Sequence, residues 1–297
     1  MTLIIIRTGV DMNESIMGSG CELILSDVPV KPVEEIERSI IKKYRKTIWT
    51  RFIKAVKEFN LIEEGDRIGV GVSGGKDSLL LCKLLQELQK HGDVSFEIEY
   101  LAMNPGYLPA NEMLIKENCK HLNIPITYFD SKIFEVVDKI SNDYPCYLCA
   151  KMRRGTLYAK AQELGCNKLA LGHHFDDVIE TQLMNIFYAG MTKTMMPRLK
   201  SDNFEGLELI RPLYYVREEH IKQFIKNTGL SPMNCGCVVA AKKTSSKRRE
   251  MKDLIASLKK IHPDVDKCIL SSGHNVNMDG IVGWTKDGKK HNFLDDY

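Results

Sequence analysis

Two groups of residues in this chain could take part in chemistry. The hexad Ser-Gly-Gly-Lys-Asp-Ser occupies residues 73–78, directly after the apolar run Arg67–Val72. Cys146 and Cys149 form a Cys-x-x-Cys pair after Pro145. A glycine loop between a strand and a helix can bind an anion, because its backbone approaches a ligand closely and the first helical N–H groups lack partners. The cysteine pair fits half a zinc site, a redox pair or part of an iron–sulfur site.

The hexad differs from the two most familiar nucleotide-binding loops. The spacing G-x-x-x-x-G-K-[ST] of the Walker loop is absent, and so is the G-x-G-x-x-G spacing of dinucleotide-binding proteins. The three residues Ser-Gly-Gly alone would indicate only a tight turn. The complete hexad between a strand and a helix indicates a distinct kind of phosphate loop.

Strand and helix patterns alternate along the chain. The predicted strands are 67–72, 96–103, 125–129, 168–174 and 207–215. The predicted helices are 37–60, 79–89, 112–122, 176–190 and 217–229. Strands separated by helices imply right-handed crossovers, so we expect an α/β fold with an open, mainly parallel five-stranded sheet and helices on both faces. Such sheets bind ligands at the carboxyl ends of their strands.

Composition sets only broad limits. The chain has 297 residues, 43% hydrophobic and 27% charged, which is ordinary for a soluble globular protein. Its net charge of +3 does not by itself indicate a polyanionic partner. Nine scattered cysteines without a secretory signal favour a reduced, cytoplasmic setting. No stretch of about 18 uncharged apolar residues is present, so we expect no membrane association.

The hexad resembles the pyrophosphate loop of the PP-loop ATP pyrophosphatase superfamily, whose fold is adenine nucleotide alpha hydrolase-like. From about Leu61 to Asn275 the chain resembles the TtcA-type tRNA 2-thiocytidine synthetases. The matching segments are "LIEEGDRI", "SGGKDS", "NPGY", "CYLCAKMRRGTLYAKAQELGCNKLALGHHFDD", "FEGLELIRPL" and "NCGC". The resemblance implies an ATP-dependent, [4Fe–4S]-dependent tRNA sulfurtransferase. Such an enzyme adenylates the 2-oxygen of cytidine 32, replaces it with sulfur, and releases AMP and pyrophosphate.

The resemblance also implies a nucleotide and Mg²⁺ site. Its expected ATP-binding residues are Ser73, Gly74, Gly75, Lys76, Asp77, Ser78, Gly172, His173 and Asp176. The expected catalytic residues are Asp77 as a Mg²⁺ contact, Asp177 for proton movement at the base, and Arg153 for charge on the departing AMP. From the residues alone, the histidines and acids of "HHFDD" could equally be a metal site or ordinary helix caps. The arginines at 153 and 154 could equally be a solvated helix face.

For the cysteines, the resemblance implies a [4Fe–4S] cluster on three ligands, with one open iron that binds sulfide and no net electron transfer. Cys146 and Cys149 would be two ligands and Cys235 the third. Cys237 competes for the third place, because the family has Cys-x-x-Cys-Gly where this chain has Cys-Gly-Cys. We expect the remaining cysteines of the matched region to be plain buried residues: Cys82, Cys119, Cys166 and Cys268.

A tRNA substrate predicts basic surfaces. Two basic runs flank the nucleotide core in the sequence, although such runs are usually solvated helix faces. The residues predicted to contact tRNA are Lys42, Lys43, Arg45, Arg154, Lys247, Arg248 and Arg249. The family implies a sulfur donor derived from a cysteine desulfurase. The oligomeric state stays open, with a homodimer among the options.

Four regions are expected along the chain. They are an unplaced N-terminal extension (1–36), a basic helix (37–60), the PP-loop core (61–229), and a cysteine-containing, basic helical C-terminal region with a tail (230–297). Three alternative functions remain. The first is a PP-loop enzyme that thiolates a uridine or a small molecule. The second is an iron–sulfur desulfidase, which would need no ATP. The third is a non-catalytic tRNA-binding metalloprotein, which would leave the hexad unexplained.

Overall fold

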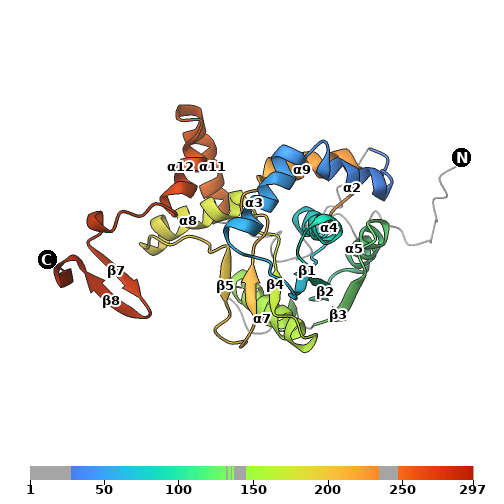
Figure 1. The fold of residues 1–297 in the computed structure, drawn as a ribbon, viewed down its shortest axis with the longest axis horizontal. Coiled ribbons are helices and arrows are strands. Elements are labelled where there is room, and N and C mark those ends of the chain that lie inside the picture. The colour runs from blue at the N-terminus through green and yellow to red at the C-terminus, as the bar shows by residue number, and fades with distance from the viewer. Residues whose placement is uncertain (1–27, 132, 135, 137–144, 234–246, 297) are drawn as a thin grey trace, which may run out of the picture. The chain divides into compact units, whose positions relative to one another are not determined.

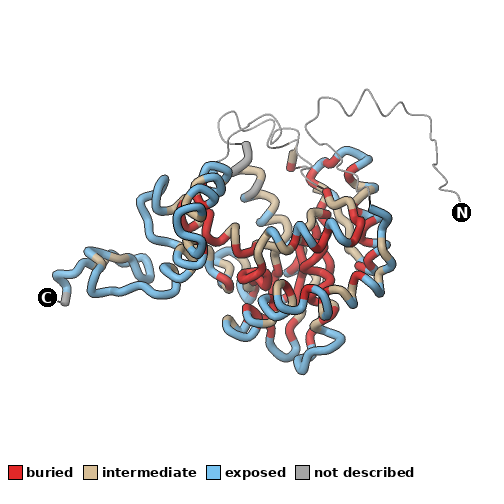
Figure 2. Tube along the Cα trace, turned by 90° about the horizontal axis from the view of Figure 1, so that it is seen from above, coloured by how far each residue is buried: buried red, intermediate tan, exposed pale blue. Residues whose placement is uncertain are grey.

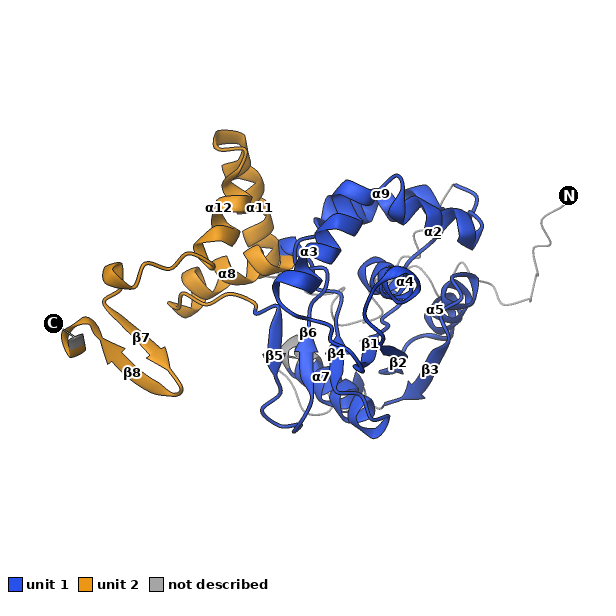
Figure 3. Ribbon diagram, in the orientation of Figure 1, with its two compact units in different colours: residues 1–176, 196–245 blue, residues 177–195, 246–297 orange. Residues whose placement is uncertain are grey.

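The computed structural model describes residues 28–296, apart from 132, 135, 137–144 and 234–246. The chain divides into two compact units (Figure 3). The first comprises Met1–Asp176 and Met196–Ser245, and the second comprises Asp177–Met195 and Ser246–Tyr297. Among the described residues, no helix has both the length and the apolar character needed to cross a membrane.

The first unit is built on a six-stranded sheet (Figure 1). Its strands are β1 (Arg67–Gly71), β2 (Glu97–Asn104), β3 (Ile126–Asp130), β4 (Lys168–Ala170), β5 (Arg198–Lys200) and β6 (Glu208–Ile210). They lie in the order β3-β2-β1-β4-β6-β5, and only β5 is antiparallel to its neighbour. The predicted α/β class and mainly parallel sheet are confirmed. The predicted number of five strands omitted β5, whose sequence Arg-Leu-Lys has one apolar residue between two basic ones and is largely exposed.

Strands β2 and β3 lie on one side of β1 in the sheet, and the later strands β4, β6 and β5 lie on the other side. Strand β1 pairs in parallel with β2, where Val70 lies opposite Tyr100, and with β4, where Val70 lies opposite Ala170. The connections leaving β1 and β4 therefore run to opposite sides, which leaves a crevice at their carboxyl ends. The hexad follows β1 and Gly172 follows β4, so both lie at this crevice.

Helices account for most of the rest of the first unit. They are α2 (Val33–Ile41), α3 (Thr50–Glu58), α4 (Lys76–His91), α5 (Pro109–His121), α7 (Pro145–Glu163), α9 (Glu218–Thr228) and the start of α8 (Phe175–Ala189). On β1, a Cβ at Gly69 would lie 3.3 Å from the Cβ of Ala161 in α7. Because side chains alternate along a strand, Ile68 and Val70 point to the opposite face, and α4 also packs against β1. Helices thus flank the sheet on both faces, as predicted.

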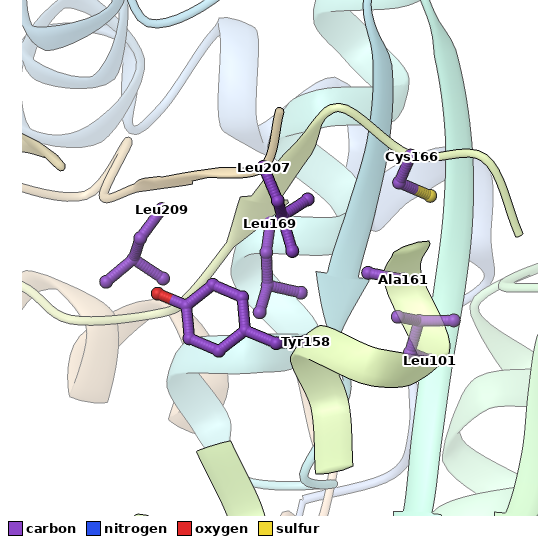
Figure 4. Close-up of a cluster of buried hydrophobic side chains, with 7 residues drawn as sticks. All are labelled: Leu101, Tyr158, Ala161, Cys166, Leu169, Leu207 and Leu209. Carbon is purple, nitrogen blue, oxygen red and sulfur yellow. The ribbon is translucent and has the colours of Figure 1, made fainter. Parts of the chain in front are cut away.

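The core lies along the sheet, where Figure 2 shows the buried residues concentrated. Figure 4 shows one cluster between α7 and the strands, comprising Leu101, Tyr158, Ala161, Cys166, Leu169, Leu207 and Leu209. The ring of Tyr158 stacks on that of Phe204 with centroids 5.3 Å apart. This packing fixes α7, the helix that begins with the Cys-x-x-Cys pair.

The helix expected over 37–60 is interrupted. It consists of α2, a π-helical turn at Arg45–Trp49 and α3. Tyr44 lies at the interruption, where its hydroxyl donates to the carbonyl oxygen of Gln223 at 3.2 Å and its ring meets Phe224 edge-on at 5.5 Å. Apolar residues at helical spacing do not reveal such an interruption, because it coincides with a contact to α9, which lies far along the chain.

The second unit contains most of α8, together with α11 (Lys247–Ile261) and α12 (Val265–Ser272). Short 3₁₀ turns at Met278–Gly280 and Phe293–Asp296 flank a hairpin, β7 (Gly283–Lys286) and β8 (Lys289–Asn292). A helix over 176–190 and a basic helical C-terminal region without helix bounds were predicted, but the hairpin was not. The sequence carried a signal for this hairpin, because Asp-Gly favours a two-residue turn with positive φ at both residues. In the structure Asp287 and Gly288 form that turn, with φ of 51° and 75°.

A buried ion pair lies at the amino ends of the strands. The Lys168 side chain is 2% exposed, and its Nζ contacts Asp66 Oδ2 at 2.6 Å. We expect Asp66→Ala to lower the free energy of unfolding by about 3 kcal/mol, because the buried ammonium group then keeps only the exposed carboxylate of Glu63, whose Oε2 lies 3.0 Å from Lys168 Nζ. Urea denaturation measures the change. Asp93→Ala removes an exposed carboxylate and should change stability by less than about 0.5 kcal/mol. Equal effects of the two substitutions would contradict this account.

Candidate active site

The hexad is held in shape by its own two serines. The backbone N–H of Ser73 and its hydroxyl both donate to Ser78 Oγ, at 3.3 and 3.2 Å. The Ser78 hydroxyl donates to the carbonyl oxygen of Gly75 at 2.9 Å, and the Gly75 N–H donates to Ser73 Oγ at 3.3 Å. These bonds join the first and last residues of the loop, so its conformation is set without a ligand.

Two glycines allow close packing around the loop. Gly74 has φ of 75°, and a Cβ there would lie 2.4 Å from Cγ1 of Ile115 in α5. Gly172, just after β4, lies so near the loop that a Cβ would be 3.1 Å from the carbonyl carbon of Asp77. The Met233 N–H donates to the carbonyl oxygen of Gly74 at 2.9 Å. The loop is therefore enclosed by segments from three distant parts of the sequence.

The amino end of α4 is suited to bind an anion. The N-cap residue is Gly75, which has no side chain that could accept a hydrogen bond from the first N–H groups of the helix. The first N–H groups of an α-helix have no acceptors within the helix, and the helix dipole adds partial positive charge at this end. A phosphate group can accept these hydrogen bonds. The predicted ATP contacts in the hexad thus come together at one helix end.

Lys76 is the cation of this site. Its Nζ lies 3.0 Å from Asp77 Oδ2 and 3.2 Å from Glu218 Oε1. Burial alone would lower the pKa of Lys76, but the two carboxylates outweigh burial and raise that pKa. Lys76 therefore stays positively charged at neutral pH and is available to neutralise a phosphate.

A chain of acidic and histidine side chains connects the hexad to α8. His174 Nε2 lies 3.8 Å from Asp77 Oδ1, and His174 Nδ1 lies 3.8 Å from Asp176 Oδ2. Asp176 Oδ2 also accepts the Glu218 N–H at 2.8 Å. Three of the predicted ATP-site elements, the hexad, Gly172 and Asp176, therefore lie together. Glu218 joins them although the sequence analysis had not selected it.

Mg²⁺ would fit at Asp77. Its Oδ1 is buried and lacks a hydrogen-bond partner among the described residues. In that part of the chain, no group of three or more His, Cys, Asp or Glu side chains could hold a metal ion alone. Mg²⁺ commonly binds one or two carboxylates, with water and substrate phosphates as its other ligands. The arrangement fits a metal ion that arrives with the nucleotide better than a resident one.

The other predicted catalytic residues have defined partners. In the first unit, Arg153 Nη2 donates to the Tyr107 hydroxyl at 3.2 Å. In the second unit, the Asp177 carboxylate accepts a hydrogen bond from Arg248, whose Nη2 also contacts Thr181 Oγ1 at 3.3 Å. Arg248 was predicted to contact tRNA, and the structure places it against Asp177. Its role toward RNA stays a prediction.

The Cys-x-x-Cys pair lies in the first turns of α7. Residues three apart share one face of a helix, and the amino end of a helix favours negative charge, so this position suits cysteinate ligands. Cys149 is half-buried and packs against the cluster of Met103 and Ile133. Cys235 and Cys237 lie outside the described residues. The described chain stops at Met233, beside the hexad, just before them.

Three of the remaining cysteines are buried, as predicted. Burial raises the pKa of the Cys82 thiol, of Cys119 to about 12 and of Cys166 to about 11, so these thiols are unreactive. The prediction is wrong for Cys268, which is exposed on α12 with its Sγ 3.5 Å from His262 Nε2. Its helical setting suggested burial, but on α12 the buried residue is Asp266.

Six of the seven predicted tRNA contacts are exposed, in helices or in the turn after α2. In the first unit these are Lys42, Lys43, Arg45 and Arg154, and in the second unit Lys247 and Arg249. Exposure is compatible with both a phosphate contact and a solvated face. Their role therefore stays a prediction.

A parallel α/β sheet with a glycine loop at its switch point defines a nucleotide-binding protein. Residues 45–233 match the model of the PP-loop domain family. The chain is 40% identical over 227 residues to the tRNA-cytidine(32) 2-sulfurtransferase of Pelobacter propionicus, which covers 75% of this chain and 83% of the relative. The enzyme of the same name from Geotalea daltonii is 40% identical over 235 residues, or 78% of this chain and 92% of the relative.

A solved structure has a similar fold. The U34-tRNA thiolase NcsA from Methanococcus maripaludis, with its [4Fe–4S] cluster, aligns over 80% of this chain and 78% of that one, with a TM-score of 0.61 and 23% identity. The chain therefore belongs to the PP-loop domain family and, within it, to the family of the tRNA-cytidine(32) 2-sulfurtransferases.

Sequence reasoning missed Glu218 and Met233. Glu218 follows the last parallel strand, β6, and carboxyl ends of parallel strands meet at one edge of the sheet. That rule, applied to "VREEH", could have indicated an acid at the site. Met233 contributes a backbone N–H to the loop, and no side-chain motif could reveal that contact.

The fit around Gly74 gives a direct test of the loop. We expect Gly74→Ala to weaken ATP binding at least about 10-fold, because the new Cβ would collide with Ile115 and displace the loop. Isothermal titration calorimetry measures the affinity. Gly65→Ala is the matched control, because Gly65 has φ of 79° and nothing within 4 Å of a Cβ. Both variants share a backbone cost of about 1–2 kcal/mol, so equal ATP affinities would contradict the packing argument.

Glu218 and a bound phosphate would compete for Lys76. We therefore expect Glu218→Gln to strengthen ATP binding several-fold when Mg²⁺ is absent, since the substitution removes a negative charge and releases Lys76. Saturating Mg²⁺ should reduce the difference. Glu219→Gln makes the same charge change at an exposed neighbour and should leave the affinity unchanged. Weaker binding by Glu218→Gln would instead mean that Glu218 positions Lys76 for the phosphate.

Proposed function

We propose that this protein is an ATP-dependent tRNA sulfurtransferase that replaces the 2-oxygen of a cytidine, at position 32, with sulfur. The observation with most weight is the site at the switch point. Lys76 and the uncapped amino end of α4 form a phosphate site in a chain 40% identical to enzymes of that name. A tRNA substrate also accounts for the exposed basic residues and places the protein in the cytoplasm.

ATP would bind with its phosphates at the hexad. The N–H groups at the start of α4 bind phosphate oxygens, and Lys76 neutralises their charge. Asp77 offers its buried Oδ1 to Mg²⁺, which neutralises the phosphates further. These groups are set in place beforehand by the serine bonds, and catalysis of phosphoryl transfer depends mainly on such positioning and charge neutralisation.

The 2-oxygen of a cytosine is a poor leaving group, so it must be activated. Its attack on the α-phosphorus forms an oxygen–phosphorus bond, breaks the bond to the β-phosphate and expels pyrophosphate. A sulfur nucleophile then adds to C2, and the carbon–oxygen bond breaks as AMP departs. We assign charge stabilisation on AMP to Arg153 and proton movement at the base to Asp177, whose carboxylate is oriented by Arg248.

The donor set fits a [4Fe–4S] cluster better than a zinc site. Cys146 and Cys149 share the start of α7, whereas zinc in a closed structural site takes four ligands, usually as two pairs. Cys235 is our choice for the third ligand. It follows the segment Ser-Pro-Met-Asn directly in the sequence, and Cys237 is its competitor. When bound, the cluster supplies a position for the incoming sulfide. We propose a cysteine desulfurase as the source of that sulfur, and leave a homodimer as an option.

Mass spectrometry of tRNA nucleosides tests this function. We expect a strain that lacks the gene to lose 2-thiocytidine, and the intact gene to restore it. Cys146→Ala and Cys149→Ser should fail to restore it, because each removes a cluster ligand, and the purified variants should contain less iron and sulfide. Unchanged 2-thiocytidine, in an organism without a second copy, would refute the cytidine assignment and favour a uridine or small-molecule substrate.

Two controls make the experiment specific. Cys268→Ser changes an exposed cysteine of the second unit that is not among the proposed ligands, and it should restore 2-thiocytidine fully. Release of AMP that depends on both ATP and tRNA separates a thiolase from a desulfidase, which would release none. Comparing the iron content of Cys235→Ser and Cys237→Ser identifies the third ligand.

A further inference from the structure

The end of α8 exposes large apolar side chains. Phe187 is 58% exposed, Tyr188 43% and Met191 52%. All three belong to the second unit and lie close together in the sequence, from the last turn of α8 to the segment just after it. Contiguous exposed apolar groups on a folded protein usually mark a surface that binds a partner. The phosphate site described above includes none of them.

This surface is held by hydrogen bonds. The Met191 N–H donates to the carbonyl oxygen of Asn185 at 3.0 Å, and Asn185 Nδ2 donates to the carbonyl oxygen of Lys193 at 2.7 Å. Gly190 ends the helix with φ of 61°, the left-handed conformation that commonly terminates helices. The chain after α8 therefore turns back on the helix and presents Phe187, Tyr188 and Met191 from an ordered segment.

Positive charge surrounds these side chains. No Asp or Glu occurs from Thr181 to Ser201, and Lys193 in that stretch is exposed. From α11, Lys247 Nζ lies 4.6 Å from the centroid of the Tyr188 ring, and Arg249 is also exposed. The carboxylate of Glu250 accepts a hydrogen bond from the Tyr188 hydroxyl, which orients the ring.

We propose that this aromatic–basic surface (Phe187, Tyr188, Met191, Lys193, Lys247 and Arg249) stacks unpaired bases of the substrate RNA and binds the adjoining phosphates. The proposal rests on the proposed function. Single-stranded nucleic acid is bound by aromatic rings that stack on bases and by cations that follow the backbone. An apolar surface that docks another protein needs no such cations. The carboxylate-free stretch and the lysine over Tyr188 therefore favour a polyanion with exposed rings.

Binding of an unmodified tRNA transcript to the full-length protein tests this surface. We expect the double substitution Phe187→Ala and Tyr188→Ala to weaken binding about 5- to 150-fold for each stacked base, equivalent to about 1–3 kcal/mol. Tyr188→Phe should lose much less affinity than the double substitution, because it keeps the ring and removes only the hydroxyl that donates to Glu250. Phe293→Ala is the matched control, since Phe293 is a 50% exposed aromatic residue of the same unit.

Salt dependence separates stacking from charge. We expect Lys247→Ala to reduce the slope of log affinity against log salt concentration by about 1, because it removes one phosphate contact. The double aromatic substitution should leave that slope unchanged while lowering the affinity. A reduced slope for the aromatic variant and an unchanged slope for Lys247→Ala would contradict the assignment of roles.

The outcomes distinguish this proposal from the proposed function. A natural protein that binds ATP but no tRNA would overturn the proposed function, and this inference with it. Normal tRNA binding by the double variant, or an equal loss in Phe293→Ala, would overturn this inference alone. If the double variant binds tRNA normally but has a different oligomeric state from the natural protein, the inference is also overturned, because the surface would then join copies of the chain. ATP affinity should be the same in all these variants.

Discussion

The architecture of the site depends on one steric constraint, the lack of room for side chains around the hexad. Gly74 faces Ile115 with no space for a Cβ, and Gly172 lies against the backbone of Asp77. Any larger residue at these positions would separate the strand-to-helix turn from α5 or from β4. The close packing keeps the first turn of α4 at the edge of the sheet, where its N–H groups remain available to a phosphate. The same steric constraint therefore brings the hexad backbone close to its neighbours and keeps the N–H groups of α4 available to an anion.

Two lysines of the first unit show that burial decides whether an ion pair stabilises the fold or leaves its lysine accessible to a ligand. Lys168 is 2% exposed and pairs with Asp66 at the amino ends of the strands, so its charge is satisfied and serves stability. Lys76 is 26% exposed and lies between Asp77 and Glu218 at the carboxyl ends. Since carboxylates outnumber cations there, an incoming polyphosphate needs additional positive charge. Under the proposed function, Mg²⁺ that accompanies the nucleotide would supply this charge.

Much of the fold could be predicted because its signals are local. Apolar strands followed by helical patterns predicted the parallel sheet, and the hexad predicted the phosphate loop at its edge. The failures have physical causes. The segment of β5 has one apolar residue between two basic ones, so it carries no strand signal. The break at Tyr44 coincides with a contact to α9, and Cys268 lies on α12, where Asp266 is the buried residue. The Asp-Gly turn of the hairpin was a readable signal that went unused.

The sequence by itself determined the residue types of the site, its mainly parallel sheet and the α/β class, because each follows from short-range patterns and from the rules for parallel crossovers. The tertiary structure alone decided the partners. It brought Glu218 to Lys76, the Met233 N–H to Gly74 and Arg248 to Asp177. No local pattern encodes such pairs, since they exist only when the folded sheet brings distant strand ends and helix starts to the same edge, or when helices pack against each other.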